Sequence, residues 1–223
     1  MLAGAVIVVL VGPAFHTMTG RRYPDPGTTG VQDGPMGFQI TQEPAADRVL
    51  DDSSFALLAD MMLDQQYPME HAFRGPAKVL ARFGSIEPGE IAAADPERFA
   101  ELCATPPAIH RFPGSMAARL QELARIVVEE YDGDASRLWT EAADGKDLLK
   151  RIQALPGFGR QKAQILASLL AKQLGVRPEG WEQAVGAYSE DGFRSVADVV
   201  DAASLQKVRD HKKEMKAAAK ARG

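Results

Sequence analysis

Apolar residues recur at helical spacing along most of the chain beyond residue 50. The clearest stripe follows steps of four, three, four and four residues, which predicts the buried face of an amphipathic helix; it comprises Met116, Leu120, Leu123, Val127 and Tyr131. Similar spacing predicts further helices around 55–62, 148–154 and 165–174, with Ser53 or Ser54 available to cap the first. No sustained alternation of apolar and polar residues indicates a strand. The pattern therefore predicts an all-α protein.

Turn residues separate the predicted helices. They occur at Gly75-Pro76, Glu87-Pro88-Gly89, Pro106-Pro107, Pro113-Gly114 and Asp132-Gly133. We expect one helical domain over residues 36–204, in which two helices joined by a glycine-containing hairpin occupy 147–174, followed by a basic C-terminal helix or tail at 205–223.

Residues 1–35 differ from the rest of the chain. The apolar run from Leu2 to Gly12 is shorter than the ~20 residues that cross a bilayer, and no basic residue precedes it as in a secretory signal. Gly, Pro, Thr and Asp dominate Thr19–Pro35, as in a linker. We expect this extension to be disordered or mis-assigned, with translation starting at Met36. A signal or membrane anchor and a short added strand are the alternatives.

The charge of the chain is unevenly distributed. The 223 residues are 45% hydrophobic and 25% charged, as in ordinary globular proteins, and the net charge of −4 at first argues against a nucleic-acid partner. Residues 36–204, however, carry −9, whereas residues 205–223 carry +5. The single cysteine, Cys103, excludes an internal disulfide and a four-cysteine iron–sulfur cluster, and it fits a reducing cytoplasm.

One segment combines glycines, a helix start and positive charge. It reads Leu155-Pro156-Gly157-Phe158-Gly159-Arg160-Gln161-Lys162-Ala163, and residues 146–162 carry a net charge of +4. Two glycines permit a tight turn and a close approach to the main chain. The N–H groups at the start of the next helix favour an anion. We therefore predict that the turn binds a backbone phosphate; the alternative is a simple turn whose basic residues aid solubility.

These residues resemble the hairpin of the helix-hairpin-helix motif in the HhH-GPD superfamily of base-excision DNA glycosylases. Leu63-Asp64-Gln65-Gln66 resembles the Gln-Gln segment that these enzymes place near the extruded base. Residues 111–131 with Asp132-Gly133-Asp134 resemble the helix and glycine turn before the hairpin. The resemblance spans about residues 37–216, and is closer to an actinobacterial-type subgroup without an iron–sulfur cluster.

The resemblance implies a two-lobed helical fold that binds double-stranded DNA and flips out a damaged base. Gly157, Gly159 and the following N–H groups would hold a phosphate, and Gln65 or Gln66 would fill the gap or contact the base. The full set of expected DNA-binding residues is Gln65, Gln66, Leu155, Gly157, Phe158, Gly159, Arg160, Gln161 and Lys162.

The catalytic residues of the family are only partly matched. Its lysine falls at Gln161, so we expect no lysine-based lyase and a monofunctional N-glycosylase. Its aspartate is missing; Glu179 is the best substitute, followed by Glu182, and Asp64 is a second internal candidate. Glu179 is equally well read as a solvated turn residue. The alternative function is that of a non-catalytic DNA-binding or lesion-sensing protein. A third hypothesis, a membrane-tethered or secreted protein, is supported only by the apolar segment Leu2–Gly12.

Few other groups suggest a ligand. We expect no required cofactor and no metal site, because His71, His110 and Glu70 match no compact metal motif; the resemblance admits a monovalent cation on the hairpin carbonyls. Two basic groups could follow a phosphate strand. The first comprises His71, Arg74, Lys78 and Arg82, and the second comprises His211, Lys212, Lys213 and Lys216. The alternative for the second group is a frayed, solvated helix. We expect a cytoplasmic, nucleoid-associated monomer with no membrane partner.

Overall fold

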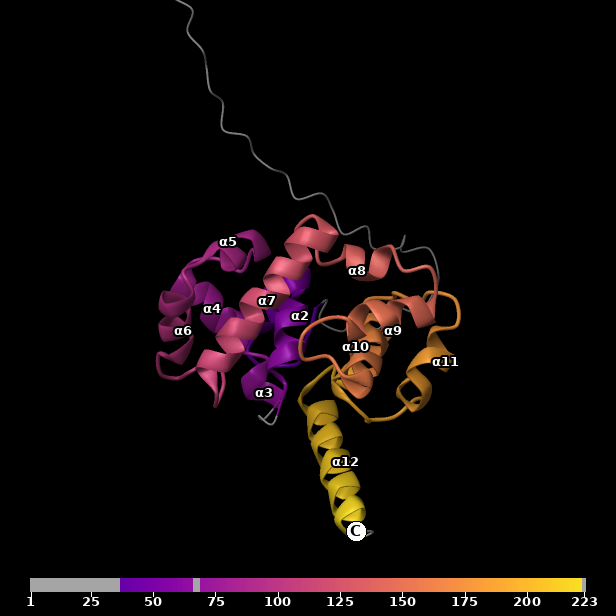
Figure 1. Cartoon of the computed structure of the whole chain (residues 1–223). Coiled ribbons are helices and arrows are strands. Elements are labelled where there is room, and N and C mark those ends of the chain that lie inside the picture. Colours follow the sequence, from indigo (N-terminus) through magenta and orange to yellow (C-terminus); the bar gives the residue numbers. More distant parts are fainter. Residues whose placement is uncertain (1–36, 66–68, 222–223) are drawn as a thin grey trace, which may run out of the picture. The chain divides into compact units, whose positions relative to one another are not determined.

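The computed structural model describes residues 37–65 and 69–221, which belong to one compact unit, Met36–Gly223. The described residues are helical and contain no strand, so the predicted all-α class is confirmed (Figure 1). The predictions for residues 1–35 lie outside the described part. Among the described helices, none is long and apolar enough to cross a membrane.

The first group of helices surrounds α2 and α7. It comprises α1 (Pro44–Asp52), α2 (Ser54–Leu63), α3 (Met69–Ala72), α4 (Gly75–Phe83), α5 (Pro88–Ala93), α6 (Pro96–Ala104) and α7 (Pro113–Tyr131). Helix α7 packs on α5 and α6 and also contacts α2, while α1, α2 and α4 pack together. The predicted stripe of α7 is buried from Met116 to Tyr131, which confirms its periodicity.

The second group is built on the two helices of the predicted hairpin. It comprises α8 (Arg137–Thr140), α9 (Gly145–Gln153), α10 (Arg160–Gln173), α11 (Trp181–Val185), the 3₁₀ turns η1 (Gly186–Tyr188) and η2 (Val196–Asp198), and α12 (Ala202–Ala221). Helix α10 packs on α9, α11, η1 and η2. Two helical lobes therefore form, and the polypeptide crosses from one to the other between α7 and α8.

Several prolines that were expected only to separate helices lie in the first turn of helices of the first lobe. Proline lies in the first turn of α1, α4, α5, α6 and α7, where its missing N–H costs nothing and its fixed φ suits a helix. Ser53, and not Ser54, caps α2 by accepting the N–H of Ala56 at 3.1 Å. Local sequence thus explains where most of these helices begin.

Helix α2 lies at the centre of the first lobe. Every residue from Phe55 to Leu63 is buried, as expected of a helix that is surrounded by others. Its C-terminal end brings the following residues, Asp64 and Gln65, to the edge of the lobe, where both are half-buried. Helix α2 thereby fixes the position of the segment that was expected to meet the base.

Candidate nucleic-acid interface

The hairpin turn connects α9 to α10 through Ala154–Gly159. Gly157 has φ of +82°, a conformation in which any other residue is strained. The N–H of Phe158 donates to the carbonyl of Leu155 at 3.2 Å and closes the turn. Gly159 is the N-cap residue of α10 and has an ordinary extended backbone. The turn therefore requires glycine at position 157 for its own geometry, but not at 159.

No side chain among the described residues caps the N-terminus of α10. Ser53, Asp95 and Asp144 each accept a main-chain N–H at the start of α2, α6 and α9, whereas α1, α4, α5 and α7 also lack a side-chain cap but carry a proline in their first turn. A β-carbon on Gly159 would have no neighbour within 4 Å. Because the first N–H groups of a helix need an acceptor, this end of α10 is open to an external anion.

Two of the expected DNA-binding side chains are part of the core. Leu155 and Phe158 are each only 4% exposed, because the turn folds their apolar side chains inward. The expectation that they bind DNA is therefore corrected for their side chains, and only their main-chain groups could reach a ligand. Both residues hold the turn in place.

Lys162 joins the hairpin to α2 instead of pointing to solvent. Its Nζ donates to the carbonyl oxygen of Met62 at 3.1 Å, and its side chain is half-buried. Burial lowers the pKa of Lys162, Asp64 opposes that shift, and Arg119 adds to it. A free phosphate contact by Lys162, as the sequence led us to expect, is thus replaced by a contact between lobes.

Gln65 is held in place by two residues of the neighbouring segment. The N–H of Phe112 donates to Nδ1 of His110 at 3.0 Å, so Nε2 of His110 carries the proton and donates to the Gln65 carbonyl at 2.9 Å. Nη1 of Arg119 donates to Oε1 of Gln65 at 2.7 Å. We call the group of Met62, Asp64, Gln65, His110, Arg119 and Lys162 the junction. Gln66 lies outside the described residues.

The sequence offered little sign of the roles of His110 and Arg119. His110 is 1% exposed, and the residue that it bonds lies 45 positions away in the chain. The side-chain partner of Arg119 lies 54 residues away. In the described chain, no group of three or more His, Cys, Asp or Glu side chains could hold a metal ion.

An exposed aromatic ring lies next to the junction. Phe112 is 48% exposed although it is large and apolar. The Arg111 guanidinium lies 4.4 Å from the centre of its ring, and the His110 ring lies 5.9 Å away. An exposed ring held in this way can stack on a base.

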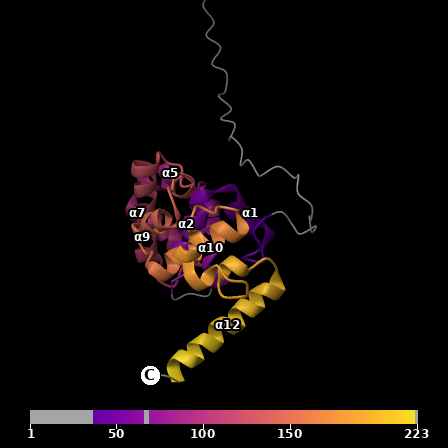
Figure 2. The same ribbon diagram turned by 90° about the vertical axis from the view of Figure 1, so that its right-hand side faces the viewer.

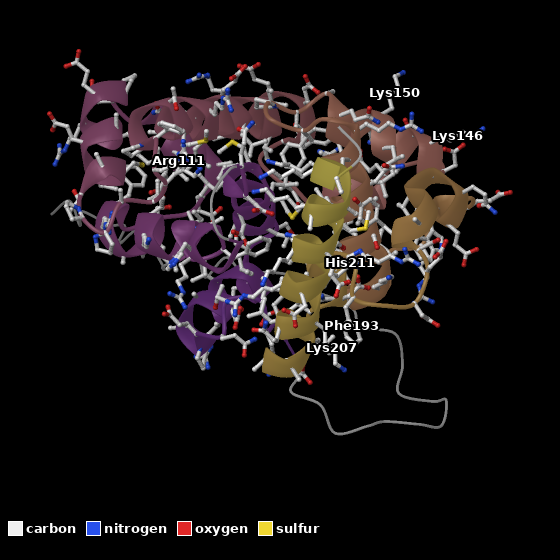
Figure 3. All side chains as sticks on the ribbon, turned by 90° about the horizontal axis from the view of Figure 1, so that it is seen from below. Arg111, Lys146, Lys150, Phe193, Lys207 and His211 are labelled. Atoms are coloured by element: carbon white, nitrogen blue, oxygen red, sulfur yellow. The ribbon has the colours of Figure 1, made fainter. Side chains whose placement is uncertain are left out.

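The remaining polar residues of the hairpin lie on its outer surface. Nε2 of Gln161 donates to the Tyr188 hydroxyl at 2.9 Å, within the second lobe. Arg160 is exposed and borders a shallow depression of about 530 Å³ that is lined by Lys146, Leu149, Lys150, Gln153, Ala154 and Arg160. Figure 3 shows Lys146 and Lys150 at one edge of the molecule. This surface is positive and adjoins the open end of α10.

The basic group at residues 71–82 has a structural role. Nζ of Lys78 donates to the Ala108 carbonyl at 3.0 Å, and Arg82 donates to the carbonyls of Thr105 and Pro107, both at 2.8 Å. Arg74 forms an ion pair with Glu43 at 3.1 Å. The suggestion that this group follows a phosphate strand is therefore wrong for these three residues, which fix the chain around α4.

The two candidate carboxylates occupy different surroundings. Asp64 is half-buried at the C-terminal end of α2, and its charge acts on Lys162. Glu179 is exposed, and its carbonyl accepts the N–H of Gly145 at 2.8 Å, at the start of α9. The hairpin turn follows the opposite end of α9, about 12 Å away along the helix axis. Among the described residues, Asp64 belongs to the junction and Glu179 does not.

A third carboxylate, Asp60, is fully buried one turn before Asp64. Neither of its oxygens has a hydrogen-bond partner among the residues that the structure describes. Burial raises its pKa well above the usual value, and the charges of Asp64 and Asp47 raise it further. Burial therefore favours the protonated form of this carboxyl group within the core of the first lobe.

Cys103 is buried on α6, and burial raises the pKa of its thiol to about 12. A thiol in this state is neither a nucleophile nor a metal ligand at neutral pH.

Two helices joined by a glycine turn that leads into an open helix N-terminus have the arrangement of a helix-hairpin-helix motif. The family model described as HhH-GPD superfamily base excision DNA repair protein matches residues 59–222, which is more than half of the chain. The chain therefore belongs to the HhH-GPD superfamily of base excision DNA repair proteins. Comparison with curated proteins and with solved structures gave no match. The resemblance to a particular subgroup stays a prediction.

Proposed function

We propose that this protein is a monofunctional DNA N-glycosylase that flips a damaged or modified base out of duplex DNA and hydrolyses its N-glycosidic bond. The observation that supports this proposal most strongly is the uncapped N-terminus of α10, which lies beside the junction because Lys162, in its first turn, bonds Met62. A phosphate site next to polar side chains at the edge of both lobes suits a nucleotide extruded from the helix.

Each part of the site has a proposed task. The open N–H groups of α10 bind a backbone phosphate, and Arg160 adds positive charge beside them. Because Arg119 donates to Oε1 of Gln65, the NH₂ group of that side chain is left to donate to a base. Phe112 stacks on a base or enters the gap left by the flipped one.

The carboxylate of Asp64 is our first choice for the reaction. Water adds its oxygen to C1′ of the sugar while the bond from C1′ to the base nitrogen breaks and the base leaves with the bonding pair. The carboxylate takes the proton of the water and stabilises the positive charge that develops on the sugar. No lysine-based lyase step is proposed, since Gln161 occupies the position of the family's lysine and Lys162 is engaged by Met62.

A non-catalytic lesion-sensing protein is the second candidate. It is favoured by the exposed position of Glu179 away from the junction, because this residue is the sequence substitute for the missing family aspartate. Such a protein would bind DNA through the hairpin without cleaving a glycosidic bond.

A panel of duplexes that carry single alkylated, oxidised or deaminated bases tests these functions. Abasic product, revealed by chemical strand cleavage, is expected for at least one lesion. Asp64→Asn should then abolish turnover with binding retained, whereas Glu179→Gln should leave turnover unchanged. The reverse result would assign the reaction to Glu179. Binding without product on every lesion would support the lesion-sensing protein instead.

The resemblance also implies a monovalent cation at the hairpin. The carbonyl oxygens of residues 154–158 would hold it, since K⁺ and Na⁺ accept such ligands; Leu155 O already accepts the N–H of Phe158 but has a second lone pair. When bound, the ion would add positive charge near the phosphate. DNA affinity should be higher in KCl than in tetramethylammonium chloride at equal ionic strength, and equal affinities would exclude the ion.

A further inference from the structure

Helix α12 extends beyond the body that anchors it. It runs from Ala202 to Ala221 and projects away from the other helices in both views (Figures 1 and 2). Ser204, Leu205 and Val208 are buried near its start. From Arg209 onward its described side chains are exposed, apart from the half-buried His211. A helix segment that buries no apolar face gains little from packing, so this part of α12 does not stabilise the body.

The charges of α12 are sorted to one side. At about 100° per residue, the basic side chains of its projecting part fall within a sector of roughly 100°; they are Arg209, Lys212, Lys213, Lys216 and Lys220. Asp210 and Glu214 fall together on the adjoining sector. Among the described side chains of residues 209–221, Met215 is the one large apolar side chain that is exposed, at 58%. The surface of α12 therefore suits a polyanion and not an apolar groove or a bilayer.

The base of α12 is fixed to the helix that carries the phosphate site. Nζ of Lys172, on α10, lies 2.6 Å from Oδ1 of Asp198, and their side chains are only 18% and 6% exposed. Nε2 of Gln173 donates to the carbonyls of Val196, Ala197 and Val199 at 3.1–3.3 Å. Both contacts hold η2, which packs on α10 and on α12. The direction of α12 is therefore set by α10.

Two further contacts define the start of α12. The N–H of Ser204 donates to Oδ1 of Asp201 at 2.6 Å, and this hydrogen bond lowers the pKa of Asp201. Nζ of Lys207 lies 4.5 Å from the centre of the Phe193 ring, and Figure 3 shows the two side chains together at the base of the helix. Helix α12 is thus a capped and anchored arm.

We propose that α12 is a second DNA-contact element, whose basic sector lies along the phosphate backbone beyond the segment held by the hairpin. This inference rests on the proposed DNA binding by the hairpin. The projecting 13 residues, Arg209–Ala221, span about 20 Å, which corresponds to about six base pairs at 3.4 Å per step. The acidic body of another copy is a weaker partner, because its charge is spread over many residues whereas DNA carries one negative charge per ~1.7 Å.

The test measures binding of the full chain to undamaged duplexes of 12 and 24 base pairs by fluorescence anisotropy between 50 and 200 mM KCl. The arm variant is Lys213→Glu/Lys216→Glu/Lys220→Glu. The matched control, Arg48→Glu/Arg98→Glu/Arg125→Glu, makes the same charge change at exposed positions elsewhere on the body. All six side chains are exposed, so both variants should fold, and their melting temperatures check this.

On the longer duplex the arm variant should bind at least ~10-fold more weakly than the control, and the slope of log K against log salt should fall by about 2 to 3. On the shorter duplex the two variants should differ by less than ~3-fold. Equal affinities of the two variants for the longer duplex overturn the role of α12, even if wild-type protein binds. Absence of wild-type binding at 50 mM KCl would instead refute the hairpin proposal. Self-association of wild type that only the arm variant loses would assign α12 to a second copy.

Discussion

Gly159→Asp should make the protein more stable and a poorer DNA binder. Gly159 has the extended backbone of an N-cap residue, and a β-carbon there meets no atom within 4 Å. Aspartate is a good N-cap and should stabilise α10 by a few tenths of a kcal/mol relative to glycine. Fewer unfolded conformations add about 0.4–1 kcal/mol. The sum, about 0.5–1.5 kcal/mol, corresponds to a rise in Tm of roughly 1–5 °C for a domain of this size.

The same carboxylate would occupy the N–H groups that we assign to a phosphate. Two like charges 4 Å apart repel by about 1 kcal/mol in water and about 4 kcal/mol near a protein surface. Binding to any duplex should therefore weaken at least ~5-fold. Thermal unfolding and fluorescence anisotropy measure the two effects on the same preparation.

Gly89→Asp is the matched control. Gly89 is exposed in the first turn of α5, and a β-carbon there also meets nothing within 4 Å. The control adds the same charge near a helix N-terminus outside the hairpin. If Gly159→Asp binds DNA as well as Gly89→Asp, the open end of α10 is not the phosphate site. A large loss of stability in Gly159→Asp would refute the reasoning about the cap.

Three further substitutions test the core and the junction. Gly157→Ala should destabilise the fold by about 1–2 kcal/mol because φ is +82°, and urea denaturation measures it; an unchanged stability would contradict the turn geometry. Arg119→Met removes the partner of Gln65 Oε1 and should lower the preference for damaged over undamaged duplex without changing the salt slope, both measured by anisotropy. The pKa of Asp60 is raised in the folded state, so above pH 3.8 the folded state binds more protons than the unfolded state. The free energy of unfolding of the wild type therefore falls as pH rises, by up to about 1.4 kcal/mol per pH unit, until the folded-state pKa is passed. Asp60→Asn should remove this loss relative to wild type and to the exposed control Asp52→Asn, measured by urea denaturation at pH 5, 6 and 7; a stability difference that does not grow with pH would contradict it.

Much of the fold could be predicted because local chemistry determines it. Three such features depend only on residues close together in the sequence. They are the apolar stripe of α7, the serine cap of α2 and the prolines that begin the helices of the first lobe. The glycine turn is of the same kind, since the positive φ of Gly157 is a property of one residue. Such features are visible in sequence because neighbouring residues supply both sides of each interaction.

The site depends on contacts between residues far apart in the chain. Lys162 is 100 residues from Met62, and Arg119 is 54 residues from Gln65. Nothing in the spacing of basic residues distinguishes Lys162, which bonds α2, from Arg160, which is exposed two residues earlier. The basic residues of α4 were interpreted as a phosphate-binding stripe because the sequence does not reveal their carbonyl partners. Those partners follow α6, more than 20 residues later in the chain.

The sequence by itself determined the helical class, the hairpin and the separation of charge between body and C-terminal helix. These properties follow from periodicity, glycine stereochemistry and composition, all of which are local. Only the tertiary structure decided that the start of α10 faces open space, that Lys162 bonds α2, that Glu179 lies apart from the junction, and that α12 is anchored on the hairpin helix. Those facts depend on burial and on distances between lobes, which exist only when the chain has folded.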